Sequence, residues 1–189
     1  QTAVSGVMIG KGGYHHFMLK EIFEQPQVIG DTLNTMLNPA SRTITLPALP
    51  FDITTLSRIT IVACGTSYYA GLIAKYWIEH LVKIPVEVDF ASEFRYRTPF
   101  LVHGGLVLFI SQSGETADTL AALRYCQQHQ QHTLAIVNTP DSTMMREADF
   151  ALQTLAGLEI SVASTKTFTT QLTVLACFTI AMAKARSII

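Results

Sequence analysis

Three short polar segments stand out in an apolar sequence, because each concentrates small hydroxyl side chains. The first is Cys64-Gly65-Thr66-Ser67, the second is Ser111-Gln112-Ser113-Gly114-Glu115-Thr116, and the third is Ser164-Thr165-Lys166-Thr167. A hydroxyl can turn its proton toward an anion, and the first turn of a helix offers unpaired N–H groups at the positive end of the helix dipole. If each segment opens a helix, the three segments could together hold a phosphate group.

An ordinary helix N-cap is the simpler interpretation of any one segment, since Ser and Thr are common at that position. The second segment, however, has several polar side chains and a glycine where one cap would suffice. A hydrogen bond to a charged group contributes about 1.5–3 kcal/mol, and millimolar affinity needs only about 4 kcal/mol. A few hydroxyl and amide donors can therefore bind phosphate without an arginine. Neither a Gly-x-Gly-x-x-Gly motif nor a Gly-x-x-x-x-Gly-Lys-Ser/Thr loop occurs, so the usual nucleotide sites are excluded.

The sequence between these segments predicts the scaffold that would bring them together. Short β-branched runs alternate with helical stretches, which is typical of parallel βαβ units and of an α/β fold with a doubly wound sheet. Ligands of such sheets bind beyond the carboxyl ends of the strands, where the first two polar segments would lie. We expect the first four strands to be central and a fifth to be weaker, at residues 59–63, 86–90, 106–110, 134–137 and 150–153.

Helical periodicity is predicted in four places. Residues 14–37 should form a helix that Pro26 bends or splits in two. The helix after the first strand should bury one face that includes Trp77, and the next should begin near Thr116. The last helix should run from about Ser164 into the final residues, and its apolar composition predicts a buried position.

Composition narrows the classes of function. A chain of 189 residues suits one domain, and 49% hydrophobic with 14% charged residues favours contact with a partner, so we expect an oligomer. A net charge of −1 without a basic run argues against binding nucleic acid or a membrane surface. Residues 1–13, rich in Gly and small residues, are predicted to be a linker or tail.

The cysteines, histidines and apolar stretches indicate a reducing, non-membrane setting. Cys64, Cys126 and Cys177 are odd in number and widely spaced, which fits free thiols in the cytoplasm, and neither they nor the histidines show metal-ligand spacing. No signal peptide is visible at the start of the chain, which resembles a fragment. Residues 172–183 are too short to span a bilayer. We expect no metal and no cofactor.

Further motifs accompany the polar segments and identify a family. They are His16-Phe17-Met18, Ala91-Ser92-Glu93-Phe94-Arg95-Tyr96-Arg97 and Val162-Ala163-Ser164-Thr165-Lys166. With them, the sequence resembles the sugar isomerase (SIS) family, whose hallmark is a strand followed by Ser-x-Ser-Gly-x-Thr. The resemblance covers residues 14–189 and implies a flavodoxin-like three-layer α/β/α sandwich around a five-stranded parallel sheet.

The resemblance also implies which residues bind substrate. The second polar segment would hold the phosphate of a sugar phosphate, two residues of the first segment would lie beside it, and the remaining two would line the other side of the sugar. In chain order these residues are Thr66, Ser67, Ser111, Gln112, Ser113, Thr116, Val162 and Ser164. No catalytic residue is implied within this chain.

Within the family, the motifs are most similar to those of enzymes that transfer ammonia from glutamine to fructose 6-phosphate and isomerise the product to glucosamine 6-phosphate. Those enzymes combine a glutaminase domain with two SIS domains, and this chain matches the first SIS domain. The implied partners are fructose 6-phosphate or glucosamine 6-phosphate, the other domains, and a second subunit in a homodimer. The chain alone is expected to bind without turnover.

Two other functions stay open: a sugar-phosphate sensor domain and a stand-alone aldose-ketose isomerase. A sensor of the regulator type would need a helix-turn-helix segment, which is not apparent, and an isomerase would need an acid or base over the sugar. Glu115 would repel a phosphate unless it is turned away. Lys166 is expected to pair with a carboxylate rather than act as a nucleophile. Residues 93–97 could form a subunit contact or approach the site.

Overall fold

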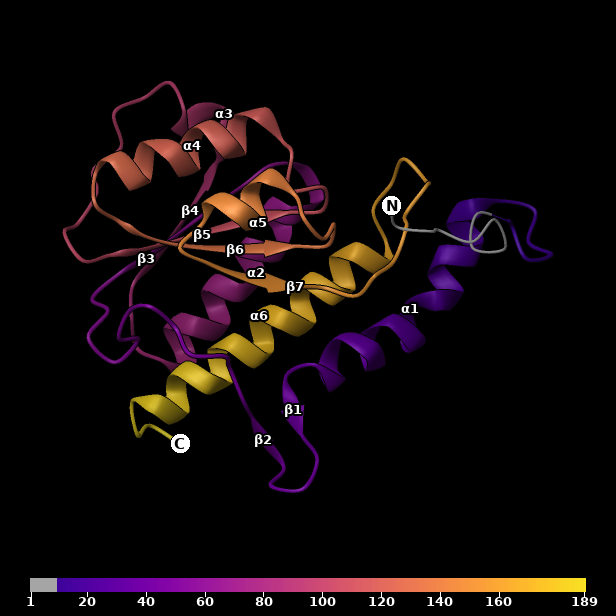
Figure 1. Ribbon diagram of the computed structural model, residues 1–189, viewed down its shortest axis with the longest axis horizontal. Helices are drawn as coiled ribbons and strands as arrows, with labels where there is room; N and C mark the ends of the chain where they lie inside the picture. Colours follow the sequence, from indigo (N-terminus) through magenta and orange to yellow (C-terminus); the bar gives the residue numbers. More distant parts are fainter. Residues whose placement is uncertain (1–9) are drawn as a thin grey trace.

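Five parallel strands form one sheet, as the sequence predicts. The computed structural model describes residues 10–189 and orders the strands β4-β3-β5-β6-β7 (Figure 1). The order reverses between β3 and β5, and such a reversal is the place where open α/β sheets bind their ligands. The strands are β3 (Ile59–Ala63), β4 (Val86–Phe90), β5 (Leu106–Ser111), β6 (His132–Val137) and β7 (Phe150–Gln153).

Helices cover both faces of this sheet, which confirms the α/β/α sandwich (Figure 1). One face carries α2 (Gly65–Leu81) and α6 (Lys166–Ala185), with α1 (Phe17–Asn34) packed against α6. The other face carries α3 (Ala91–Phe94), α4 (Ala117–Gln128) and α5 (Thr143–Glu147). A small antiparallel ribbon of β1 (Leu37–Asn38) and β2 (Thr43–Ile44) follows α1. The predicted tail falls mainly on residues 1–9, which lie outside the described residues, and the domain start at residue 14 stays a prediction.

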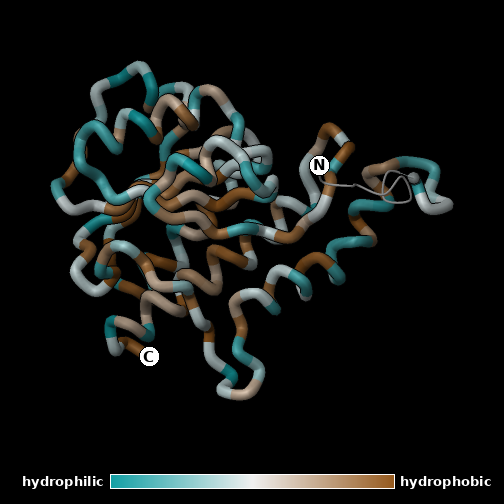
Figure 2. The backbone as a smooth tube through the Cα atoms, in the orientation of Figure 1, coloured by the Kyte–Doolittle hydropathy of each residue, from teal (hydrophilic) through white to brown (hydrophobic). Residues whose placement is uncertain are grey.

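Alternating strand residues build two cores, one on each face of the sheet. In β3, Ile59 and Ile61 pack with α2 and α6, whereas Val62 packs with α4 on the opposite face. Every residue of β3 and β5 is buried, and the hydrophobic stretches of the chain coincide with the sheet (Figure 2). Side chains alternate across a strand, so a strand covered on both faces is apolar at nearly every position.

The predicted central position of residues 86–90 is wrong, because β4 lies at the edge of the sheet. Its sequence alternates, and Glu87 and Asp89 are only partly buried. Both carboxylates face arginines: Arg58 and Arg97 pair with Glu87, and Arg97 also pairs with Asp89. Charged residues on an edge strand also discourage pairing with another chain.

Helix α1 continues through Pro26 and is not split there. A proline inside a helix leaves the carbonyl four residues earlier without its usual N–H partner. Here the side-chain Nε2 of Gln25 donates to the Ile22 carbonyl at 3.1 Å, which replaces the missing bond. A local side-chain donor therefore lets the helix tolerate Pro26.

Helix α6 is buried, as predicted, although it begins at Lys166 rather than Ser164. Among residues 10–189 it is the one helix long and apolar enough to cross a membrane, but 56% of that stretch is buried within the protein. It packs against α1 and α2, which is the position of a core helix.

A substitution at Gly71 tests how closely α2 approaches the sheet. A Cβ at this position would lie 2.9 Å from Cγ2 of Ile61 and 3.3 Å from Cγ1 of Val88. We expect Gly71→Ala to lower the free energy of unfolding by about 1–3 kcal/mol, because a well-packed core resists extra volume. Equilibrium urea unfolding measures this change.

Gly30→Ala in α1 is the matched control, since a Cβ there would meet no atom within 4 Å. Its expected effect is a gain of about 0.5–1 kcal/mol from helix propensity. Equal effects of the two substitutions would contradict close packing at Gly71.

Candidate functional site

A concavity of about 170 Å³, which we call the polar pocket, lies at the carboxyl ends of β3 and β5. These strands are neighbours, and Ala63 pairs with Ile110, so the first and second polar segments emerge side by side. The first segment leads into α2 and the second into α4, so two helix N-termini meet here. The lining residues are Cys64, Ser67, Ile110, Ser111, Gln112, Ser113, Thr116 and Thr119.

The backbone of the second segment is held by the turn after β6. The carbonyl of Gln112 accepts from the amides of Asn138 and Thr139 at 3.1 and 3.2 Å, and that of Gly114 accepts from the amide of Met144 at 3.0 Å. In a trans peptide the C=O and N–H point in opposite directions. The amide of Ser113 is therefore turned away from the β6–α5 side of the loop.

Gly114 is required by this loop for two reasons. Its φ of +65° lies in the left-handed region, and a Cβ would come within 2.2 Å of Oγ of Ser142. The position tolerates neither the conformation nor the volume of another residue.

Two serine hydroxyls of the pocket have oxygens that already accept hydrogen bonds from backbone amides. Oγ of Ser111 accepts from the Gly114 amide, and Oγ of Ser113 accepts from the Glu115 amide, each at 3.1 Å. A hydroxyl has one proton to donate besides its lone pairs. Ser113 consequently keeps its own proton for a ligand, while Ser111 and Thr116 share one hydrogen bond at 3.1 Å between their oxygens.

Thr119 is a pocket residue that the sequence reasoning missed. It lies in the first turn of α4 and is 1% exposed, and its Oγ1 has no hydrogen-bond partner among the described residues. Buried hydroxyls in proteins are nearly always satisfied, so an unpartnered one at a pocket wall indicates a place for a ligand or water oxygen. The sequence signal was available, since Thr119 follows Thr116 at helical spacing.

Five of the eight predicted site residues line the polar pocket and three do not. Ser67, Ser111, Gln112, Ser113 and Thr116 line it, whereas Thr66, Val162 and Ser164 lie outside. Val162 is fully exposed at the tip of the loop before α6, and the Ser164 hydroxyl donates to Glu159 at 3.0 Å.

Two carboxylates hold the loop that carries Val162 and Ser164. Glu21 of α1 is 2% exposed and accepts from the Ile160 and Ser161 amides at 2.6 and 3.1 Å. Glu159 accepts from the Thr165 and Thr167 amides at 2.8 and 3.2 Å, which caps α6. The third polar segment is therefore bound internally at both ends.

Lys166 and Glu115, the ionisable side chains of the polar segments, form an ion pair and a hydrogen bond within the protein. Nζ of Lys166, 4% exposed, lies 2.8 Å from Oε2 of Glu24, as predicted for a lysine paired with a carboxylate. Burial opposes ionisation of Glu24, but the hydrogen bond and charge of Lys166 lower its pKa. Oε1 of Glu115 accepts from the Thr143 amide at 2.7 Å, and this bond lowers the pKa of Glu115. Glu115 thus points toward α5 and not into the pocket.

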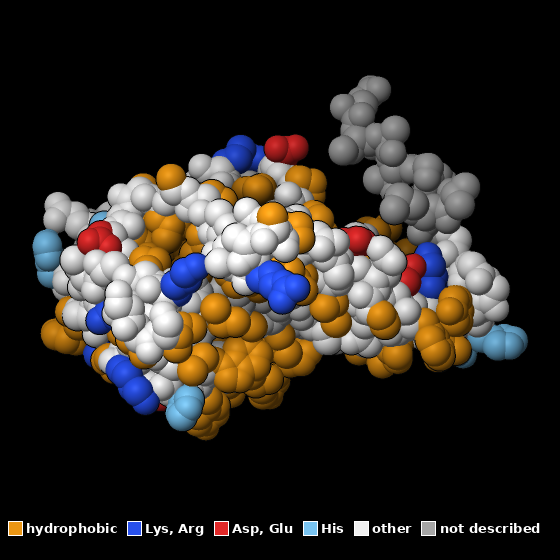
Figure 3. Space-filling model, turned by 90° about the horizontal axis from the view of Figure 1, so that it is seen from below, with side chains coloured by type: hydrophobic (Ala, Val, Ile, Leu, Met, Phe, Trp, Pro, Cys, Tyr) orange, Lys and Arg blue, Asp and Glu red, His pale blue; other side chains and the backbone are white. Residues whose placement is uncertain are grey.

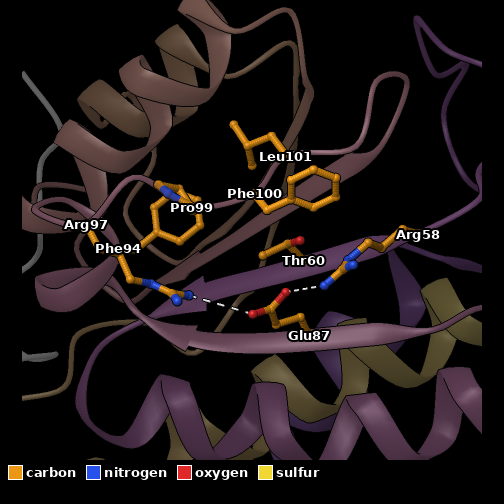
Figure 4. Close-up of a pocket in the computed structure, with 8 residues that line it drawn as sticks. All are labelled: Arg58, Thr60, Glu87, Phe94, Arg97, Pro99, Phe100 and Leu101. Carbon is orange, nitrogen blue, oxygen red and sulfur yellow. Dashed lines mark hydrogen bonds and ion pairs between the residues drawn. The ribbon is translucent and has the colours of Figure 1, made fainter.

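A second concavity, of about 220 Å³, lies beside the N-terminal halves of β3 and β4 (Figure 4). Figure 4 shows Arg58 and Arg97 directed at Glu87. Arg97 also pairs with Asp89, so two carboxylates balance the two guanidinium groups. The arrangement fastens the loop after α3 to the sheet edge. Arg95 pairs with Asp118 of α4 at 2.9 Å, so neither it nor Arg97 lines the polar pocket.

Comparison with known proteins identifies the family of the chain. The family model described as "SIS domain" matches residues 52–181. The chain belongs to the SIS domain family. Within the described residues 10–189, no group of three or more His, Cys, Asp or Glu is placed to hold a metal ion.

Curated relatives of this SIS domain carry the name glutamine–fructose-6-phosphate aminotransferase [isomerizing]. The relative from Zymomonas mobilis is 55% identical over 98% of the chain, and one from Bradyrhizobium diazoefficiens is 57% identical over 97%. The chain spans about 30% of the length of each. A solved structure, the C-terminal domain of glucosamine-fructose-6-phosphate aminotransferase from Francisella tularensis, matches with a TM-score of 0.89 and 48% identity over 95% of this chain and 51% of that one.

Gly114→Ala tests the loop geometry of the SIS domain. We expect a loss of about 2–4 kcal/mol in unfolding free energy, the sum of backbone strain and the clash with Ser142. Gly104→Ala is the control, because Gly104 also has a positive φ, +71°, but open space around its Cβ position. Strain alone predicts about 1–2 kcal/mol there. Urea unfolding compares the two, and equal losses would mean that the close approach to Ser142 is unimportant.

Thiol alkylation tests the exposure of the pocket. Burial raises the pKa of Cys126 to about 12 and also raises that of Cys177, whereas Cys64 is half-buried at the pocket wall. Since the thiolate is the nucleophile, iodoacetamide at pH 8 should modify Cys64 first, and the other two only after unfolding in urea. Peptide mass spectrometry reads the sites, and Cys64→Ser should abolish the native-state reaction. Modification of Cys126 at the rate of Cys64 would contradict the burial.

Proposed function

We propose that the chain is the phosphosugar-binding SIS domain of a glutamine–fructose-6-phosphate aminotransferase, and that it binds fructose 6-phosphate with the phosphate in the polar pocket. The observation that carries the proposal is the meeting of hydroxyl and amide donors from two helix N-termini at the β3–β5 reversal. The names of the relatives at 55% and 57% identity support the choice of enzyme.

Binding follows from the arrangement of donors. The Ser113 hydroxyl, the amide of Ser113, the hydroxyls of Ser67 and Thr119, and the start of α4 all offer protons or positive dipole ends to an anion. Each hydrogen bond to a charged group contributes about 1.5–3 kcal/mol, and the helix dipole adds about 0.3–2 kcal/mol. These donors suffice for millimolar or tighter affinity without a cation in the pocket lining.

The size of the polar pocket supports a binding domain that other parts of the enzyme complete. At about 170 Å³ it is smaller than the 300–1,000 Å³ typical of small-molecule sites, so it holds the phosphate and leaves much of the sugar uncovered. Thr66, Val162 and Ser164, with the second SIS domain, would cover the rest. The glutaminase domain would supply ammonia, and the product would be glucosamine 6-phosphate for hexosamine biosynthesis.

An exposed apolar surface on α1 supports the proposed partners, and the free cysteines support the proposed cellular location. Helix α1 exposes a row of large apolar side chains toward solvent on the face seen in Figure 3, where another domain or a homodimer partner could pack. Its members are Met18, Leu19, Ile22 and Phe23. We propose a cytoplasmic location, which the free thiols of all three cysteines support.

The chain alone is proposed to bind without turnover, in contrast to a stand-alone isomerase. Aldose-ketose isomerisation needs an acid or base over the sugar carbons. The polar pocket has no His, Asp, Glu or Lys in its lining, and Glu115 is bonded to Thr143 instead. A sensor domain would share the same pocket, and only the lack of conversion separates it from an isomerase.

Calorimetric titration with fructose 6-phosphate tests the proposal. Ser113→Ala removes a hydroxyl donor and should weaken binding about 10- to 100-fold, as expected for one hydrogen bond to a charged group. Inorganic phosphate should compete in the same titration, and bound fructose 6-phosphate should slow alkylation of Cys64.

Ser57→Ala provides the control, because Ser57 is exposed and does not line the pocket. It should bind as the wild type does. Absence of binding to any hexose phosphate would disprove the function, and conversion of fructose 6-phosphate by the isolated chain would favour the stand-alone isomerase.

A further inference from the structure

Gln171 of α6 reaches the polar pocket from the buried core of the protein. It is 2% exposed, and its Nε2 donates to Oγ of Ser67 at 3.0 Å, joining residues 104 positions apart in the sequence. Its Oε1 is buried without a hydrogen-bond partner among the described residues. A buried polar side chain with one unsatisfied end is unfavourable for stability, which points to a role in function.

We propose that Gln171 is a positioning residue that directs the proton of the Ser67 hydroxyl into the polar pocket, toward the phosphate. The inference rests on the proposed function. A hydroxyl oxygen that accepts a hydrogen bond must send its own proton elsewhere. No acceptor for the Ser67 proton is found among residues 10–189, and Ser67 lines the pocket.

The rigid packing around Gln171 fixes the orientation of the Ser67 hydroxyl. The neighbouring residues on its face of α6, Thr167, Thr170 and Val174, are 0% exposed, so the helix cannot turn without disturbing the core. Ser67, in contrast, lies in the first turn of α2 and is only partly buried. The rigid partner therefore sets the direction of the mobile hydroxyl before the ligand arrives, and less rotational freedom is lost on binding.

Gln171→Glu reverses the hydrogen bond, and this gives the sharpest test. An ionised carboxylate can only accept, so it would draw the Ser67 proton away from the pocket and place a negative charge behind it. We expect fructose 6-phosphate binding at pH 8 to weaken by more than about tenfold. As the pH is lowered toward 5, protonation of Glu should bring the ratio of variant to wild-type affinity back toward one.

Gln171→Met removes the donor without adding charge and covers the case in which Gln171→Glu does not fold. The Ser67 hydroxyl would then rotate freely, and the expected loss in affinity is about two- to tenfold. In a Ser67→Ala background the same substitution should have no further effect, because the hydroxyl it orients is gone. A purely structural role would give the same loss in both backgrounds.

Thr167→Val is the matched control on the same buried face of α6. Its Oγ1 has no partner among the described residues, and it does not line the pocket, so binding should be unchanged. Wild-type affinity in both Gln171 variants would overturn the inference while the proposed function stands. Absence of binding by the wild-type chain would overturn the proposed function and this inference with it.

Discussion

The parallel pairing of β3 with β5 is the constraint on which the site depends. Its register sets Ala63 opposite Ile110, so Cys64 and Ser111 leave the sheet together and the helices that follow diverge to opposite faces. The gap between two diverging helix N-termini is where backbone amides and hydroxyls gather. Because every residue of both strands is buried, a one-residue shift of this register would move each side chain into the opposite core and disrupt the packing of both.

The positions of the strands follow from the local hydrophobic pattern and could be predicted from the sequence. Features that depend on contacts with other parts of the fold could not. Short β-branched and apolar runs that alternate with helical stretches predicted all five strands of the sheet. The edge position of β4 was missed although Glu87 and Asp89 mark it, because strand order depends on which helices lie where. Pro26 was given too much weight, because Gln25 satisfies the carbonyl that the proline leaves free.

The candidate site likewise combines residues that are close in sequence, which could be predicted, with contacts between distant residues, which could not. The sequence predicted that Ser111, Gln112, Ser113 and Thr116 belong to one site, and they line one pocket because they are close in sequence and precede one helix. Their role in binding stays a prediction. Gln171 could not be predicted, since its bond to Ser67 spans 104 positions. Nor could the bonds of Glu21 to Ile160 and Ser161, in the loop that carries Val162, because Glu21 is about 140 positions away in the sequence.

The lining of the polar pocket has proton donors but no His, Asp, Glu or Lys. Under the proposed function, this asymmetry explains why binding and chemistry would be divided between parts of a larger enzyme. A carboxylate near the phosphate would repel it, and the one carboxylate in the second segment, Glu115, is tied to Thr143. Under the proposed function, a base for the sugar carbons would therefore have to approach from the open side of the pocket. A domain packed over that side could supply the base, cover the sugar and exclude water in one step, while the hydroxyls of this chain would hold the phosphate at a distance from it.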